Sequence, residues 1–145
     1  MDMLNKQKVV IIGNGMVGHH LVEQLQTQSD STEVTVLSAE SRLAYDRVHL
    51  SEFFSGKTAD DLAMTNPEQY HAWGVDFRTN AKVVNIDKAN KRVITETGEV
   101  FSYDKLVLAT GSYPFVPPIP GKDRDHCLVY RTIDDLHAIS KSAES

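Results

Sequence analysis

Glycines near the start of the chain recur in the pattern G-x-G-x-x-G, which lets a backbone approach a phosphate group. The six positions are Gly13, Asn14, Gly15, Met16, Val17 and Gly18. In such a motif the first glycine allows a tight turn, the second lets the backbone come close to a pyrophosphate, and the third lets the next helix pack on the strand. The start of that helix then offers N–H groups and a positive dipole end to the anion. The pattern predicts a dinucleotide-binding loop, with a purely structural glycine turn as the alternative.

The segments around this loop predict the elements that must position it. Residues 9–12 are apolar and β-branched, which indicates a strand buried on both faces. Apolar positions at spacings of three and four over residues 16–28 predict an amphipathic helix, and residues 33–37 predict a second strand. Short loops join these elements, so we expect a right-handed β-α-β unit with parallel strands.

The second strand should be followed by an acid that accepts hydrogen bonds from a ribose diol. Ser38 stands directly after that strand, and the first acid is Glu40. We therefore expect Glu40 to bind the ribose, with a solvated loop carboxylate as the alternative. No arginine immediately follows Leu37 to favour a 2′-phosphate, but this does not separate NAD from FAD.

The remainder of the chain predicts short elements. Two short helices are expected at 58–64 and 67–73. Three short strands separated by turn residues suggest a small antiparallel meander, and they lie at 75–77, 82–86 and 92–95.

The last third of the chain predicts a strand, an extended segment and a helix. Residues 106–109 indicate another buried strand, and the prolines and glycine of 114–121 exclude a helix or a central strand there. Residues 133–142 predict a closing helix capped by Thr132 or Asp134. We expect an α/β fold with a parallel sheet and a small antiparallel meander.

Composition and charge exclude several classes of function. The chain has 145 residues, with 15 Lys and Arg against 20 Asp and Glu, and a net charge of −5. A nucleic-acid or anionic-membrane partner would favour a surplus of basic residues, so we expect neither. The apolar runs are too short for a membrane-spanning helix, and the polar start lacks the apolar stretch of a signal peptide. We therefore expect a cytoplasmic protein.

The side chains that could bind metals are few. One cysteine, Cys127, excludes an intrachain disulfide and cannot by itself ligate an Fe–S cluster. The six histidines show no metal-ligand spacing. We expect no metal site and interpret the histidines as solvated or core side chains. His49 is of more interest, because it lies in the same loop as Arg47.

Two later segments, taken with the glycine loop, resemble a known superfamily. Residues 103–111 read as a strand that runs into Thr-Gly, where a small residue lets the backbone pass close to a ligand. Residues 44–51 form a loop whose Arg47 could donate to phosphate. Nearly the whole chain thus resembles the FAD-binding N-terminal part of the pyridine nucleotide–disulfide oxidoreductase superfamily. Within it, the NAD(P)H-dependent nitrite reductase large subunit is most similar over residues 11–19, 45–51, 109–114 and 129–136.

This resemblance implies where the residues of a cofactor site would lie. The glycine loop would hold the FAD pyrophosphate, and Glu40 would lie near the adenosine ribose. Arg47 would lie along the pyrophosphate or the flavin, with a surface salt bridge to Asp46 as the alternative. Backbone at Lys82 and Val83 would meet the adenine edge. The segment that would close over the cofactor consists of Ala109, Thr110 and Gly111.

One position departs from the ferredoxin-reductase relatives. These usually carry a lysine after Leu-Ser, near the flavin, whereas Glu52 follows Leu50-Ser51 here. This weakens the resemblance to ferredoxin reductases and leaves the residues around the flavin N5 unassigned. No catalytic residue is assigned, and Tyr70 and Trp73 are expected in the core rather than stacked on a flavin.

The resemblance also implies parts that this sequence does not carry. The NAD(P)H site would need a second glycine motif, and none is present. The sirohaem and Fe–S cluster of the nitrite reductases would need further cysteines. We expect a fragment truncated before the NAD(P)H domain, with a Rossmann-like FAD-binding domain over 1–121 and a connecting segment over 122–145. Such a fragment would be inactive by itself, and its parent could have a small subunit or form a homo-oligomer.

The sequence is compatible with three functions. The first is the flavin module of a nitrite reductase that passes electrons from NAD(P)H through FAD to metal centres. The second is the FAD module of a ferredoxin- or rubredoxin-reductase-like oxidoreductase. The third is a non-catalytic nucleotide-binding domain. The loop 45–50 favours the first over the second, and the segment 109–111 favours either over the third.

Overall fold

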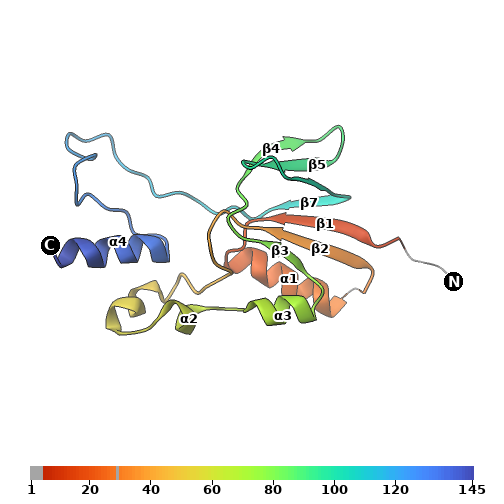
Figure 1. The fold of residues 1–145 in the computed structure, drawn as a ribbon, viewed down its shortest axis with the longest axis horizontal. Coiled ribbons are helices and arrows are strands. Elements are labelled where there is room, and N and C mark those ends of the chain that lie inside the picture. Colours follow the sequence, from red (N-terminus) through yellow and green to blue (C-terminus); the bar gives the residue numbers. More distant parts are fainter. Residues whose placement is uncertain (1–4, 29) are drawn as a thin grey trace. The chain divides into compact units, whose positions relative to one another are not determined.

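The structure is a computed structural model that describes residues 5–28 and 30–145 (Figure 1). It divides the chain into two compact units. The first unit comprises Met1–Tyr45 and Ala63–Gly111, and the second comprises Asp46–Leu62 and Ser112–Ser145. The domain boundary expected after residue 121 stays a prediction.

A four-stranded parallel sheet forms the centre of the first unit. Its strands are β1 (Gln7–Ile12), β2 (Thr32–Leu37), β3 (Asp76–Arg78) and β7 (Lys105–Leu108), in the order β3-β2-β1-β7. Every strand pair in this sheet is parallel. The helix α1 (Met16–Gln28) connects β1 to β2, which confirms the predicted β-α-β unit.

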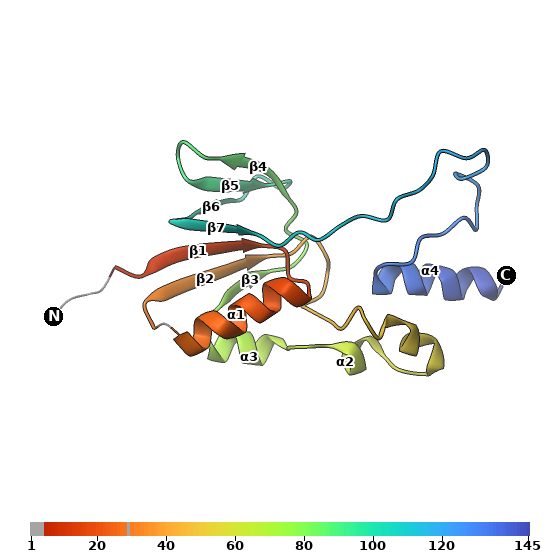
Figure 2. The ribbon, with the colours of Figure 1, turned by 180° about the vertical axis from the view of Figure 1, so that it is seen from behind.

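The alternation of side chains along β1 builds two apolar layers. Val9 and Ile11 pack with Val22 of α1 and Tyr70 of α3 (Pro67–Ala72). The neighbouring positions Val10 and Ile12 point to the other face, toward the second sheet. The first unit is therefore a stack of helices, parallel sheet and antiparallel sheet, and Figure 2 shows α1 and α3 on one face of the parallel sheet.

The antiparallel meander is present but contains other strands than the sequence suggested. It consists of β4 (Val83–Asp87), β5 (Arg92–Thr95) and β6 (Val100–Ser102). The strand expected at 75–77 belongs instead to the parallel sheet, as β3 beside β2. A three-residue strand carries too little periodicity to choose a partner, and the preceding helix α3 returns the chain to the parallel sheet.

The apolar run at 106–109 predicted a buried strand, but the corresponding strand β7 is partly exposed. It lies at the edge of the parallel sheet, where Leu106 and Val107 are half-buried and Leu108 is 61% exposed. An apolar run marks a strand without telling whether it lies at the centre or at the edge of a sheet.

The second unit holds short helices and an extended segment. These helices are the 3₁₀ helix η1 (Leu50–Ser55), α2 (Ala59–Leu62) and α4 (Ile133–Ala143). Thr132 caps α4, because its side chain accepts a hydrogen bond from Asp135 N–H and the Asp135 carboxylate accepts one from Thr132 N–H. Across the described residues of both units, no helix has the length and apolar character to cross a membrane.

Candidate dinucleotide-binding site

The glycine loop begins where β1 passes close to the end of β7. Gly13 has a φ of +107°, which side-chain-bearing residues rarely adopt. A Cβ atom on Gly13 would lie 2.1 Å from the carbonyl oxygen of Ala109. Gly13 N–H also donates to the Leu37 carbonyl at 2.8 Å. Both the conformation and the close approach therefore require glycine at position 13.

Gly18, in the first turn of α1, also lies too close to backbone to carry a side chain. A Cβ atom at this buried position would lie 2.3 Å from the carbonyl oxygen of Gly13. The absent side chain therefore lets α1 lie directly against the loop that precedes it, which is the packing role predicted for the third glycine.

Gly15 differs from both, because it faces open space. No heavy atom other than those of its chain neighbours lies within 4 Å of a Cβ atom built on it. The first hydrogen bond of α1 runs from His19 N–H to the Gly15 carbonyl, at 3.0 Å. The amides of the first helical turn thus lack acceptors within the helix. The middle of the loop offers polar N–H groups beside unfilled space, which suits an anion.

Glu40 is held at the same edge of the sheet, in the loop after β2. Its N–H donates to the Ser38 side chain at 3.2 Å, and its carbonyl accepts from Asn80 N–H at 2.9 Å. The hydroxyl of Tyr45 donates to the Glu40 carboxylate at 2.7 Å. Tyr45 is itself only 3% exposed, so the carboxylate is held by a fixed partner.

The start of β4 is tied to this loop. Ala81 N–H donates to the Ser38 carbonyl at 2.7 Å, which brings Lys82 and Val83 beside the end of β2. The Lys82 carbonyl already accepts a hydrogen bond from Glu96 N–H, at 2.8 Å. The residue Lys82 is exposed.

The segment after β7 completes this edge. Ala109 N–H donates to the Ile12 carbonyl at 2.8 Å, and Gly111 has a φ of +70°. Thr110 lines a cavity of about 370 Å³ together with Ile12, Val83 and Leu108. The first unit therefore brings four predicted segments to the carboxyl edge of its parallel sheet: 13–18, Glu40, 82–83 and 109–111.

Arg47 belongs to the second unit and is described there by itself. Its Nη1 atom donates to the Arg131 carbonyl at 3.0 Å, and the side chain lines a cavity of about 270 Å³ with Tyr113 and Tyr130. The phosphate role of Arg47 stays a prediction.

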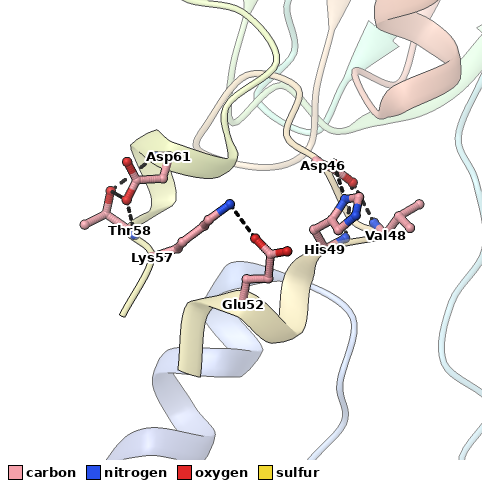
Figure 3. A network of polar contacts seen from close by, with 7 residues as sticks. All are labelled: Asp46, Val48, His49, Glu52, Lys57, Thr58 and Asp61. Atoms are coloured by element: carbon pink, nitrogen blue, oxygen red, sulfur yellow. Dashed lines mark hydrogen bonds and ion pairs between the residues drawn. The ribbon is translucent and has the colours of Figure 1, made fainter. Parts of the chain in front are cut away.

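The neighbouring Asp46 pairs with His49 (Figure 3). The Asp46 carboxylate accepts from His49 Nδ1 at 2.6 Å and from Val48 N–H at 2.9 Å. This hydrogen bond raises the pKa of the exposed His49 and lowers that of Asp46. His49 therefore belongs to a local turn, in which Glu52 also pairs with Lys57.

Comparison with known proteins now decides the family. The family model described as pyridine nucleotide-disulphide oxidoreductase matches residues 7–145. The chain belongs to this family. It is 44% identical over 142 residues to the nitrite reductase (NADH) large subunit of Escherichia coli, covering 97% of this chain and 17% of that protein. It is 34% identical over 143 residues to the assimilatory nitrate reductase electron transfer subunit of Bacillus subtilis, covering 97% of this chain and 18% of that one.

Solved structures show the same fold. The NADH:rubredoxin oxidoreductase of Clostridium acetobutylicum matches with a TM-score of 0.80 and 26% identity, over 96% of this chain and 35% of that one. The chain spans less than a fifth of the length of the two curated relatives.

The chain also contains a buried polar network that was not predicted from the sequence. The Asn14 side chain accepts from Ala44 N–H at 2.8 Å and donates to the Tyr70 hydroxyl at 2.9 Å. The Tyr70 hydroxyl lies 2.8 Å from His19 Nδ1, and His19 Nε2 lies 3.4 Å from a Glu23 oxygen. Only the core position of Tyr70 was predicted, and it is confirmed by an exposure of 0%.

Burial controls the protonation of two members of this network. Desolvation lowers the pKa of His19 from 6.5 and outweighs the nearby Glu23 carboxylate, which raises it. Burial also raises the pKa of Tyr70 above 10.0, so its hydroxyl keeps its proton. The network therefore contains a neutral imidazole and a neutral phenol near neutral pH.

Stability is expected to fall when the pH drops below the ordinary histidine pKa. The unfolded chain protonates His19 near 6.5, whereas the folded chain resists protonation until a lower pH. Between about pH 7.5 and about pH 5.5, the free energy of unfolding should fall more steeply for the wild type than for His19→Gln, measured by urea unfolding. Equal slopes would show that His19 ionises alike in both states.

Proposed function

We propose that this chain is the FAD-binding part of an NAD(P)H-dependent nitrite reductase large subunit. The parent protein would pass electrons from NAD(P)H through FAD to a sirohaem and an Fe–S cluster, which reduce nitrite to ammonia in nitrate assimilation. The NAD(P)H site and the metal centres would belong to other parts of that parent. The observation that supports nucleotide binding is Gly15, which is open to a ligand between two glycines whose Cβ positions are filled by backbone. The choice of a nitrite reductase is supported by the 44% identity to such a large subunit.

The residues at the sheet edge fit the adenosine diphosphate half of FAD. The open Gly15 and the first-turn amides of α1 suit the pyrophosphate. The Glu40 carboxylate, oriented by Tyr45, can accept hydrogen bonds from a ribose diol. We propose that backbone at Lys82 and Val83 meets the adenine and that the segment 109–111 closes over the cofactor.

When bound, FAD supplies hydride acceptance from a nicotinamide and the transfer of single electrons. The chain itself supplies binding and orientation. The loop at 13–18 fixes the pyrophosphate, and Glu40 fixes the ribose. We propose that Arg47 adds positive charge along the pyrophosphate or the flavin. No catalytic side chain is assigned.

The identity to nitrite reductase large subunits favours this function over the second candidate. A rubredoxin-reductase-like function has support of its own, from the fold shared with NADH:rubredoxin oxidoreductase. At the position where lysine is usual in ferredoxin-reductase relatives, Glu52 instead pairs with Lys57 at 2.5 Å. A carboxylate therefore stands at the position where those relatives usually carry a positive charge. Nitrite-dependent and rubredoxin-dependent NAD(P)H oxidation by the parent protein would decide between the two.

The parent is further proposed to be cytoplasmic and to act with a small subunit or as a homo-oligomer. Size-exclusion chromatography with light scattering on the parent would test the assembly. A monomer with no co-purifying subunit would contradict it.

The nucleotide site is tested by titrating FAD into the chain and following flavin fluorescence. We expect saturable binding of FAD, and competition by ADP. Absence of binding by FAD, ADP and NAD at millimolar concentrations would overturn the proposal for these residues. Binding of NAD in preference to FAD would favour the non-catalytic nucleotide-binding alternative.

Replacing Glu40 with glutamine is expected to weaken ADP binding about tenfold, because charge-assisted hydrogen bonds to the ribose diol are lost. The control is 2′,3′-dideoxy-ADP, which lacks both hydroxyls. Its affinity should be equal for wild type and Glu40→Gln in a competition titration. An equal loss with both nucleotides would show that Glu40 acts on the loop rather than on the ribose.

A further inference from the structure

The network around Tyr70 has only one consistent arrangement of its hydrogens. Burial keeps His19 neutral, and its Nε2 lies 3.4 Å from a carboxylate oxygen of Glu23, which places the imidazole proton on Nε2. His19 Nδ1 then has to accept, and the Tyr70 hydroxyl is its donor at 2.8 Å. The Tyr70 oxygen in turn accepts from the Asn14 side-chain amide at 2.9 Å.

The contacts of the Asn14 side-chain amide are consistent with this arrangement of hydrogens. With its NH₂ group committed to Tyr70, its oxygen is directed at Ala44 N–H, 2.8 Å away. The reverse orientation would set two donors against each other at Ala44 and leave the Asn14 oxygen facing Tyr70. The Ala44 N–H and the Tyr70 hydroxyl thus hold Asn14 in the same orientation, and Asn14 links the glycine loop to the loop after β2.

Three members of the network, Asn14, His19 and Tyr70, are also closed off from water. The exposed fractions are 0% for Tyr70, 1% for His19 and 6% for Asn14. The His19 ring stacks on Tyr70 with centroids 5.7 Å apart and on Trp73 at 6.5 Å. In such surroundings an unmatched donor or acceptor is costly, so the polar groups hold one arrangement.

We propose that Tyr70 is a positioning residue for the nucleotide, acting through Asn14 on the glycine loop. Its hydroxyl holds Asn14 so that the glycine loop and the loop at Ala44 already have the binding conformation before the ligand arrives. Preorganisation of this kind raises affinity by removing the cost of ordering the loop on binding. The inference rests on the proposed function, since it takes FAD as the ligand.

The test compares Tyr70→Phe with Thr65→Val by FAD titration, at a temperature where both variants are folded by circular dichroism. Tyr70→Phe removes only the hydroxyl and is expected to weaken FAD binding about tenfold, equal to about 1.4 kcal/mol. Thr65→Val removes another buried hydroxyl of the same region, which bonds to Gln69 at 2.8 Å. Its FAD affinity should equal that of the wild type.

A double variant distinguishes positioning from general loosening of the fold. If Tyr70 acts through Asn14, then Asn14→Ala and the double variant should each lose about the same factor as Tyr70→Phe, because coupled positions are not additive. Multiplied losses in the double variant, or an unchanged FAD affinity in folded Tyr70→Phe, would overturn the inference.

Two further outcomes have a definite meaning. If Tyr70→Phe does not fold, Asn14→Ala carries the test: weaker FAD binding supports the inference, and wild-type affinity overturns it. If the wild type binds no FAD, the proposed function fails and the inference fails with it. Wild-type binding with an unaffected Tyr70→Phe would instead overturn the positioning role alone.

Discussion

Replacing Gly13 with alanine is expected to destabilise the first unit by about 4 kcal/mol, a large part of the stability of an ordinary domain. A residue with a side chain is strained at the φ of +107° found here. The added Cβ would also lie 2.1 Å from the Ala109 carbonyl oxygen, so β1 and β7 would have to separate locally. Urea unfolding followed by circular dichroism measures the loss.

Gly74 provides a matched control in the same unit. It also has a positive φ, +66°, but nothing lies within 4 Å of its Cβ position. Gly74→Ala should therefore cost only the conformational penalty, about 1 kcal/mol. If Gly13→Ala costs no more than Gly74→Ala, the close approach to β7 does not contribute.

Replacing Gly15 with valine is expected to leave stability nearly unchanged and to weaken FAD binding strongly. The Cβ position of Gly15 is open and its φ lies outside the strained range, so the unfolding free energy should stay within about 1 kcal/mol of the wild type. The side chain would occupy the space that the pyrophosphate needs. FAD affinity should fall at least 100-fold, equal to about 2.8 kcal/mol, in the fluorescence titration.

Gly15→Ala gives a graded control, because it adds one methyl group at the same point. Its FAD affinity should lie between those of the wild type and Gly15→Val, with stability near the wild type. Wild-type FAD affinity in folded Gly15→Val would show that the pyrophosphate lies elsewhere. Together the variants at positions 13 and 15 separate the glycine that the fold needs from the glycine that the ligand needs.

Local signals in the sequence predicted the elements with strong periodicity. The helix α1 has the predicted bounds, Met16–Gln28, and β5 has the predicted bounds, Arg92–Thr95. The Thr132 cap of α4 was one of the two predicted. These features depend on residues within a turn or two of each other, so the sequence carries them directly.

The predictions that were wrong concern the neighbours of strands, which are distant along the chain. The strand β3 joined the parallel sheet instead of the meander, and β6 was not predicted. The strand β7 was expected to be buried but lies at a sheet edge, with Leu108 exposed. A strand's own residues indicate that it is a strand, whereas its neighbours depend on the path of the rest of the chain.

The sequence by itself determined the glycine loop, the β-α-β unit around it and the resemblance to the oxidoreductase family, because each is encoded in residues close together along the chain. Only the tertiary structure showed that the glycines differ, with Gly13 and Gly18 filled by backbone and Gly15 open. It alone brought Tyr70 to Asn14 and His19, across more than fifty residues of sequence. Spacing along the chain cannot reveal such contacts, because they form only when α1 and α3 pack on the same face of the folded sheet.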